Sequence, residues 1–511
     1  MTTTLSGLDW TICISYLLIV LALGVWFSRQ QHDNEDYFVG GRTMHWFPIG
    51  LSLFAGTFSS LSFVGLPREA AYDDYHLLLA IFFIPLVVSP IVAWLFVPLY
   101  HRLKLTSAYE YLERRFDRRV RLTASLLFML YNIGWIGNLL VAVGKILQVV
   151  LDLNEPQVSG LLIGVGLFAT FYTALGGVKA VVWTDALQAF ALGGGMLAVL
   201  FLAVGKVDGG WPAVWEIGSQ HAKFEMFRME FTSEHGNFFG ACAFGFFVYL
   251  AAHAVHFTAV QRYVSMPTVR AARQSLIVNG VMVSAVCLVF FLVGSTLFAF
   301  YQQSGNELFD ELARTDNGDQ LLPHFVLTEI PGFGLTGLLL AGLFAAAMSS
   351  MDSGINSLTA TVVCDWMTGR DSPSLKHSRI LSLIFGVAAI AVALVLQQIG
   401  GPVFHMIMTI AGTLLGLLLG VFLLGMLSPR ANSAGTLIGV ASAIVVFTVA
   451  KLGGMSFWWD GACTSMTTLV VGLFASLLFP PPDAGALRGL EVGEVKRNIT
   501  NSAEDPVLRA Q

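Results

Sequence analysis

The chain has 511 residues, of which 55% are hydrophobic and 12% are charged, and its formal net charge is -5. This composition, with 51 glycines and a mean hydropathy of +0.71, excludes an ordinary soluble globular domain and predicts an all-α polytopic membrane protein. The small net charge gives no reason to expect a nucleic-acid partner, and the lipid bilayer is the expected environment.

Apolar windows of roughly 18 to 25 residues predict about thirteen transmembrane helices. In chain order they cover residues 9–28, 46–66, 76–100, 122–151, 157–175, 181–205, 237–260, 275–301, 321–352, 380–398, 404–427, 433–451 and 463–479. The first window lacks a basic leader and should remain in the membrane. We therefore expect one transmembrane domain over 1–479, followed by a polar, disordered tail over 480–511.

The distribution of basic residues predicts the orientation of these helices. Seven basic residues occur in the segment 101–121, and later loops add further arginines and lysines: Arg262, Arg270, Arg273, Arg370, Lys376 and Arg379. The segment 302–320 instead holds five acids and one arginine. Because cytoplasmic loops are enriched in Lys and Arg, we expect the N-terminus outside and the C-terminus in the cytoplasm, as an odd span count requires.

Two of the predicted helices contain polar and glycine-rich interruptions. FAGTFSSLSFVGLP (54–67) interrupts the second span, and FGACAFGFFVYLAAHAVHF (239–257) interrupts the seventh. The two interrupted segments are five spans apart, which is typical of transporters built from inverted repeats. Their ion and solute sites lie where the helices unwind, since exposed backbone is tolerated in a membrane only where it lines a cavity.

The segment AAAMSSMDSGINS (345–357) gathers polar side chains inside an apolar span. One helix face carries residues spaced i, i+3, i+4 and i+7: Ala346, Ser349, Ser350, Ser353 and Ser357. Asp352 and Asn356 flank this face. Oxygens gathered in this way can replace the hydration shell of a hard cation. The alternative is close helix packing through small residues, or serines bonded to carbonyls of their own helix.

Three further positions have both a functional and a structural interpretation. Asp185 and Gln188 are either ligands of a second cation or the capping box of the sixth span. His253 and His256, in the second interrupted segment, either contact a solute or bond to backbone groups. Lys145 is expected to extend towards the membrane interface, although a role as counter-ion to a carboxylate solute stays open.

Six motifs in order make the chain resemble the sodium:solute symporters, the carriers of sugars, iodide, monocarboxylates, vitamins and sialates. The motifs are YFVGGRTM (37–44), GLPREAAY (65–72), TSAYEYLERRFDRRVR (106–121), FYTALGGVKAVVWTDALQ (171–188), VQRYVSMPTVRAARQS (260–275) and GLLLAGLFAAAMSSMDSGINS (337–357). The resemblance implies a LeuT-type inverted repeat of five plus five helices over about 46–427. One extra helix precedes it at 9–28, and two follow within 433–479.

The resemblance also implies a set of binding residues. The sodium site would comprise the carbonyls of Ala55, Phe58 and Ala346 and the hydroxyls of two serines, Ser349 and Ser350. A second cation site found in some members would involve Asp185, Gln188, Asp352 and Ser353. Asp352 departs from the Ser or Thr of many members. The solute-binding positions would be Ser62, Asn138, Tyr249, His253 and His256. Asn138 matches a solute-contacting position of the sugar carriers, whereas Ser62, Tyr249 and His253 stand where those carriers have other residues.

The sequence therefore predicts a sodium-coupled symporter that imports a small polar solute of the carboxylate, sugar or amino-acid type, with Na⁺ as the coupling ion. It assigns no catalytic residues. The alternatives are a proton-coupled carrier of the same fold, an intramembrane enzyme and a channel. The enzyme is disfavoured because no catalytic motif accompanies the buried serines and histidines. The channel is disfavoured because nothing resembles a repeated filter.

Overall fold

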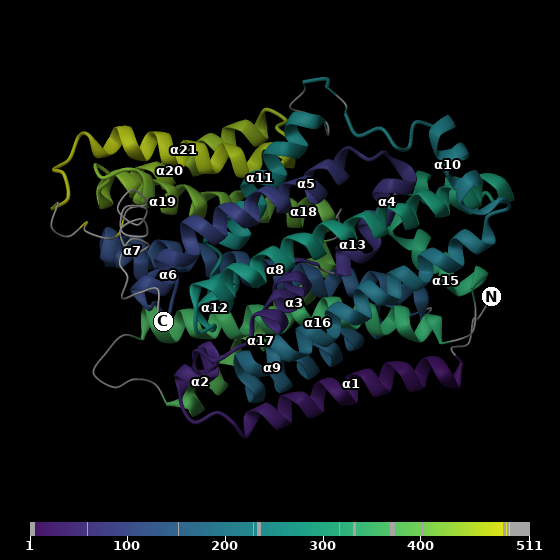
Figure 1. Ribbon diagram of the computed structural model, residues 1–511, viewed down its shortest axis with the longest axis horizontal. Coiled ribbons are helices and arrows are strands. Elements are labelled where there is room, and N and C mark those ends of the chain that lie inside the picture. The colour runs from purple at the N-terminus through teal and green to yellow at the C-terminus, as the bar shows by residue number, and fades with distance from the viewer. Residues whose placement is uncertain are drawn as a thin grey trace, which may run out of the picture.

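The computed structural model describes residues 6–483 except 59, 152, 228, 232–236, 316, 331–333, 368–373 and 400–402, together with Leu487 and Leu490. In this part of the chain the regular elements are helices, most of which run in roughly one direction across the molecule (Figure 1).

The first half of the chain contains α1 (Gly7–Ser28), α2 (Asn34–Val39), α3 (Trp46–Thr57), α4 (Ser60–Tyr72), α5 (His76–Ile91), α6 (Val97–Leu103), α7 (Glu110–Arg115), α8 (Arg118–Val150), α9 (Glu155–Lys206), α10 (Gly210–Gln220), α11 (Phe238–Ala254) and α12 (Phe257–Val264). The second half contains α13 (Val269–Ser304), α14 (Leu308–Arg314), α15 (Leu321–Glu329), α16 (Leu335–Thr361), α17 (Leu375–Ile399), α18 (Val403–Ile410), α19 (Gly416–Leu427), α20 (Ser433–Leu452) and α21 (Asp460–Ser476). Single π-helical turns, η2 (Val92–Phe96), η4 (Val362–Trp366) and η5 (Ala411–Leu415), extend α5, α16 and α18.

Among the described residues, nine helices are long and apolar enough to cross a membrane, or eleven when each bent pair is taken as one span. The all-helical membrane fold is therefore confirmed. Two predicted windows, 157–175 and 181–205, lie in the single helix α9, which kinks at Gly177, where φ is +57°. The window 321–352 was wrong in its bounds, because α15 is a separate short helix and the spanning helix begins at Leu335.

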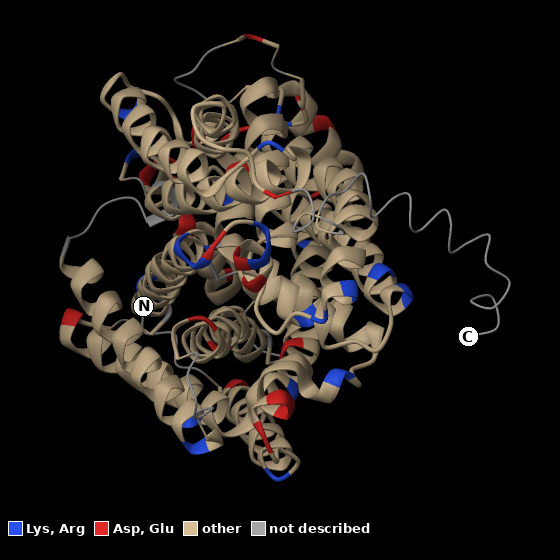
Figure 2. Cartoon of the chain, turned by 90° about the vertical axis from the view of Figure 1, so that its left-hand side faces the viewer, with Lys and Arg blue, Asp and Glu red and all other residues tan. Residues whose placement is uncertain are grey.

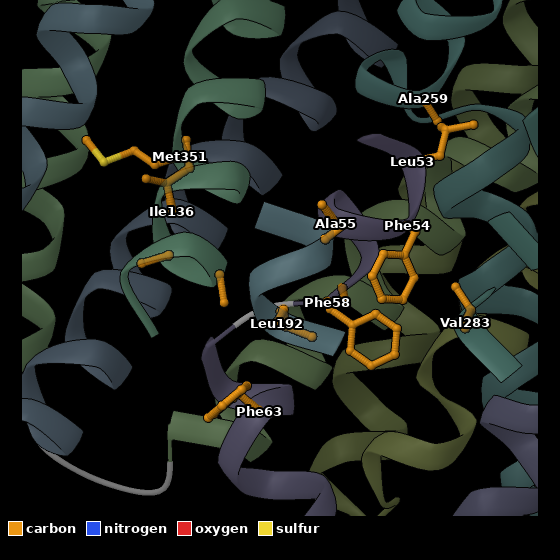
Figure 3. Close-up of a cluster of buried hydrophobic side chains, with 14 of the residues drawn as sticks. Leu53, Phe54, Ala55, Phe58, Phe63, Ile136, Leu192, Ala259, Val283 and Met351 are labelled. Atoms are coloured by element: carbon orange, nitrogen blue, oxygen red, sulfur yellow. The ribbon is translucent and has the colours of Figure 1, made fainter. Parts of the chain in front are cut away.

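Both predicted interruptions are present as breaks between two helices. α3 and α4 meet at 58°, and α11 and α12 meet at 48°. At the first break Phe58 leaves the helix with an extended backbone, at φ -91° and ψ 124°. Its ring packs against Phe54 at 4.9 Å (Figure 3) and against Phe290 of α13 at 5.5 Å, so aromatic rings surround the point where the helix ends.

α16 is the most enclosed of the spanning helices. Of its most apolar 18-residue window, 89% of the residues are buried, compared with 22% for α1. α9, α1, α8 and α3 all pack against it. The polar segment predicted at 345–357 therefore lies at the centre of the bundle and is turned away from lipid on every side.

The basic segment 101–121 forms the end of α6, α7 and the start of α8, at the end of the molecule shown in Figure 2. Arg102, Lys104 and Arg114 are exposed there, as expected for loop residues. Arg115 is instead buried and donates to three carbonyls around the end of α19, those of Gly425, Ser428 and Ala431. Arg115 thus supplies donors to the last carbonyls of a helix, which have no partner within it. The cytoplasmic side predicted for this segment stays a prediction.

Helix contact in this bundle depends on glycines at a few close crossings, of which Gly294 of α13 is one. A Cβ at this position would lie 2.2 Å from the Pro67 carbonyl oxygen and 2.7 Å from the Cβ of Ala70, both in α4. We expect Gly294→Ala to separate α13 from α4 and to lower the free energy of unfolding by about 1–3 kcal/mol, the usual cost of overpacking. Thermal unfolding of the purified protein in detergent measures this change.

Gly194→Ala in α9 is the matched control, because a Cβ there meets no atom within 4 Å. It should leave the unfolding temperature unchanged or raise it slightly, since alanine favours the helix. Equal destabilisation by both changes would contradict the packing argument.

Candidate functional site

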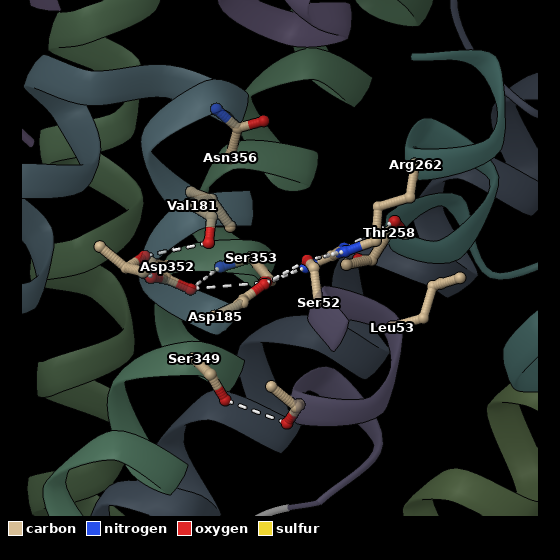
Figure 4. A network of polar contacts seen from close by, with 12 residues as sticks. Ser52, Leu53, Val181, Asp185, Thr258, Arg262, Ser349, Asp352, Ser353 and Asn356 are labelled. Carbon is tan, nitrogen blue, oxygen red and sulfur yellow. Dashed lines mark hydrogen bonds and ion pairs between the residues drawn. The ribbon is translucent and has the colours of Figure 1, made fainter. Parts of the chain in front are cut away.

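The serine face of α16 meets the broken end of α3 at Ser349. Its hydroxyl donates to the carbonyl oxygen of Ala55 at 3.1 Å and lies 3.4 Å from the carbonyl oxygen of Ala346 (Figure 4). Ala55 lies in the last turn of α3, where carbonyls lose their partners in the helix. Three of the predicted sodium ligands, Ala55, Ala346 and Ser349, thus lie together where α16 contacts α3.

Ser350 and Phe58 complete the predicted sodium ligands. The Ser350 hydroxyl is buried and has no hydrogen-bond partner in the described part of the chain. Phe58 is also buried, and its carbonyl belongs to extended backbone beyond the end of α3. A buried hydroxyl without a partner is costly in protein unless an ion or water binds it. The donor set is all oxygen and uncharged, which suits Na⁺.

The second predicted cation site contains a charged group that the sequence analysis placed in a cytoplasmic loop. Arg262 lies in α12, is 3% exposed, and pairs with Asp185 of α9 at 2.7 Å. The same terminal nitrogen donates to the Ser353 hydroxyl at 2.6 Å. The assignment of Arg262 to a loop was wrong. After the second break the chain continues as the short helix α12, bent by 48° from α11, and Arg262 is buried there.

Asp185 does not cap a helix, so that interpretation of its spacing was wrong. It lies eight residues beyond the Gly177 kink, within the second part of α9, and is fully buried. Its Oδ2 accepts from the Ser52 hydroxyl of α3 at 2.5 Å and from Arg262 at 2.7 Å, rather than from backbone groups at its own helix start. Its Oδ1, and both amide atoms of Gln188, have no partner among the described residues.

Asp352 faces a different set of groups on α9. Its Oδ2 accepts from the Tyr172 hydroxyl at 2.7 Å and lies 3.4 Å from the Thr184 hydroxyl. Its Oδ1 lies 3.3 Å from the Ser353 hydroxyl, which is in turn 3.5 Å from Asp185. Ser353 therefore links the two carboxylates, although each has its own donors. Among the described residues, Gln188 forms no hydrogen bond with either carboxylate.

A cavity of about 240 Å³ lies between the two broken helices. Four of the five predicted solute positions line it: Ser62, Tyr249, His253 and His256. Asn138 does not reach it; this side chain is fully buried and donates to the Gly134 carbonyl of its own helix at 2.9 Å. Three other residues of α8 line the cavity, and the sequence analysis missed them: Tyr131, Asn132 and Trp135.

The two histidines of the cavity have different surroundings. His253 stacks on Tyr249 at 4.0 Å, and its ring nitrogens lie 3.1 Å from the Tyr249 carbonyl and 3.0 Å from the Asn279 amide. This ring is held by backbone, as the structural interpretation predicted. His256 has one amide neighbour, Asn132 at 3.4 Å, and is half-buried at the start of α12, so it is the histidine better placed to meet a solute.

Lys145 is exposed on α8, and its expected position at the membrane interface stays a prediction. The described contacts do not bring it to either carboxylate.

Two broken helices that enclose a cavity, next to an oxygen-lined ion position, define a secondary transporter. The chain belongs to the sodium:solute symporter family, whose model matches residues 37–442. It is 31% identical to the sodium/sialic acid symporter SiaT of Proteus mirabilis over 95% of this chain and 98% of that protein. It is 32% identical to the human sodium/iodide cotransporter over 88% of this chain and 70% of the other.

The fold agrees with this assignment. A solved structure of a Na⁺-coupled sialic acid symporter, in a substrate-bound outward-open state, superposes with a TM-score of 0.85 at 29% identity and covers 94% of this chain and 99% of that one. Membership of this family confirms the sequence prediction of a sodium-coupled symporter with Na⁺ as the coupling ion.

Proposed function

We propose that the chain imports a small polar organic solute with sodium bound at Ala55, Phe58, Ala346, Ser349 and Ser350. The observation that carries this proposal is the contact of Ser349 with the Ala55 carbonyl at the break of α3, beside the unpartnered hydroxyl of Ser350. Sodium at this position would hold α3 against α16, so that ion binding stabilises one arrangement of the broken helix. Sodium binding would then also favour the shape of the adjoining cavity that goes with this arrangement.

The solute is proposed to bind in the cavity between α3, α8 and α11. Polar groups, including Asn132, His256 and Ser62, are set there among aromatic rings such as Tyr131 and Trp135, and Arg262 also lines the cavity. Such a lining suits a small molecule with hydrogen-bonding groups and an apolar face. The related proteins are named for sialic acid, iodide, vitamins and monocarboxylates, which makes these compounds the first to test.

We also propose the number of membrane spans, their inverted repeat and their orientation. Thirteen spans follow if α9 crosses the membrane twice, once on each side of Gly177, and if the 17-residue α21 spans as well. The inverted repeat of five plus five helices is supported by the two breaks, at α3–α4 and α11–α12. The exposed basic residues near α6 and α7 support a cytoplasmic face there, and an N-terminus outside.

A screen of ligand-induced thermal stabilisation tests the function. Sugars, amino acids, monocarboxylates and sialates are added to the purified protein in sodium or in potassium. A ligand of the folded state raises the unfolding temperature by mass action, and for a sodium symporter we expect a shift in sodium that is absent in potassium. Equal shifts in both salts would contradict sodium coupling.

Counterflow in proteoliposomes then separates the remaining classes. A carrier exchanges labelled solute against a preloaded unlabelled pool, whereas an enzyme leaves a modified product and a channel shows no stimulation by solute on the far side. A proton-coupled carrier is the second candidate, because Asp352 is a fully buried carboxylate that accepts hydrogen bonds from the uncharged residues Tyr172, Thr184 and Ser353. Uptake driven by a pH gradient without sodium would favour it.

A further inference from the structure

The π-helical turn η2 leaves one carbonyl oxygen that needs a donor from outside its own helix. The N–H of Val97 donates to the Val92 carbonyl, five residues back instead of the four of an α-helix. The following residue, Pro98, has no N–H to donate. The Ala93 carbonyl therefore receives a hydrogen bond from neither of them, and the Nε of Arg273 in α13 donates to it at 3.1 Å. This contact holds the arginine between η2 and α13.

The rest of the Arg273 guanidinium is available to a ligand. Its terminal nitrogens form no hydrogen bond or ion pair with any residue that the structure describes, and the side chain is half-buried. The guanidinium carbon lies 5.4 Å from the centroid of the Trp94 ring, and this tryptophan is 50% exposed. A guanidinium that contacts a ring through its flat face can still donate from the N–H groups at its edge. Arg273 thus presents two fixed donor groups at the surface of the helix bundle.

An exposed apolar surface begins next to these donors. One face of α13, with the spacing i, i+3, i+7 and i+11, carries Arg270, Arg273, Ile277 and Val281. Ile277 is 45% exposed and Val281 is 54% exposed. α5 packs against α13 and adds the exposed Val87. Basic residues are therefore followed by apolar ones over two helical turns, which is the order of a lipid headgroup followed by its acyl chains.

The side chains around this end of α13 carry positive charge. Arg270 is exposed one turn before Arg273. α6, which packs against α13, carries the exposed Arg102 and ends at the exposed Lys104. Within the described ranges, none of these four side chains forms an ion pair with a carboxylate. A negative ligand is therefore favoured here, and the adjoining apolar surface favours a lipid over a soluble anion.

We propose that the surface formed by η2, α5 and the first turns of α13 binds the headgroup of an anionic phospholipid. The phosphate oxygens accept from the terminal nitrogens of Arg273, in the paired geometry that a guanidinium offers to phosphate. The acyl chains lie along Ile277 and Val281, and Trp94 lies at the level of the headgroup, where tryptophan is enriched in membrane proteins. This site is separate from that of the solute, because none of these residues lines the cavity.

Native mass spectrometry of the purified full-length protein tests the proposal. The protein in detergent is titrated with phosphatidylglycerol or with phosphatidylcholine of the same acyl chains, and the fraction of chains with a bound lipid is measured. Both lipids contain a phosphate, but only phosphatidylglycerol has a net charge. We expect it to reach half occupancy at a concentration lower by about fivefold or more. Arg273→Gln should raise that concentration by about fivefold, the contribution of one basic residue at a membrane surface.

Arg119→Gln is the matched control, because Arg119 is exposed at the start of α8 and its loss removes the same charge away from α13. It should bind phosphatidylglycerol as the wild type does. If Arg273→Gln does not fold, Arg270→Gln replaces it, since the exposed Arg270 side chain has no hydrogen bond to lose within the described chain.

Three results would overturn the proposal. The first is equal affinity of the wild type for both lipids. The second is an equal loss of phosphatidylglycerol binding in Arg273→Gln and Arg119→Gln. The third is displacement of phosphatidylglycerol by inorganic phosphate, which would assign the arginine to a soluble anion. For a lipid site we expect inorganic phosphate to leave the bound fraction unchanged, because it makes no contact with the apolar face.

Discussion

Replacing Ser349 and Ser350 together with alanine should raise the sodium concentration that gives half-maximal solute uptake by about tenfold or more, because a site without charged ligands depends on each of its oxygens. Ser349 touches the Ala55 carbonyl, and the Ser350 hydroxyl has no other described partner, so both are available to an ion. The measurement is initial uptake into proteoliposomes over a series of sodium concentrations, with saturating solute.

Thr361→Val in the same helix is the control for this experiment. Its hydroxyl bonds the Ser357 carbonyl one turn back at 2.8 Å, away from the break of α3. Valine has nearly the same shape, so we expect no change in the sodium requirement. Normal uptake by the double alanine variant at limiting sodium would mean that the coupling ion binds elsewhere in the protein.

The largest effect on stability is expected from Asp365→Ala. Asp365 lies in η4 at the end of α16, is 1% exposed, and pairs with Arg121 of α8 at 2.7 Å. Its other oxygen accepts from the Ser107 hydroxyl at 3.1 Å. Removing the carboxylate leaves a buried guanidinium without its main partner, which costs about 3–5 kcal/mol. We expect a large fall in unfolding temperature and in the yield of folded protein.

Glu113→Gln removes the other carboxylate that contacts Arg121 and serves as the matched comparison. The Glu113 side chain is 38% exposed, so its ion pair is screened by water and should contribute less than about 1 kcal/mol. A similar loss of unfolding free energy in Asp365→Ala and Glu113→Gln would show that burial does not decide the strength of these ion pairs. Thermal unfolding of both variants in the same detergent provides the comparison.

The sequence predicted the broken helices and the serine face because both signals are local. Glycines and polar residues interrupt an apolar run where α3 and α11 end, and helical spacing alone places Ser349, Ser350 and Ser353 on one face. The bounds of α16 were less accurate, because the predicted window 321–352 ran across IPGFG (330–334). A proline and two glycines in this stretch are a helix-breaking signal that the apolar window ignored.

The environment of Arg262 could not be predicted in the same way. Its partners Asp185 and Ser353 lie 77 residues before it and 91 residues after it. The rule that basic residues mark cytoplasmic loops counts charges by their position along the chain and cannot recognise one that a short helix returns to the interior. The sequence clue was its place directly after the second broken segment, in a stretch too short to span.

The sequence also did not predict which side of the long helix α8 faces the cavity, as Asn138 shows. It lies on α8, as do Asn132 and Trp135, but only the latter two line the cavity. The hydrophobic pattern of α8 gives little information about which side faces inwards, because apolar residues surround the helix on all sides.

The enclosure of α16 determines which parts of the protein can move during transport. A helix with 89% of its apolar window buried can change place only by repacking several neighbours at once, and close-packed interiors resist such changes. The breaks before α4 and α12 interrupt the hydrogen bonds of their helices, so a change of angle at these points would need fewer of them to be remade. We therefore expect α16, which carries the serines of the proposed sodium site, to keep its place during transport, and the change that opens one side of the membrane or the other to occur at the two breaks.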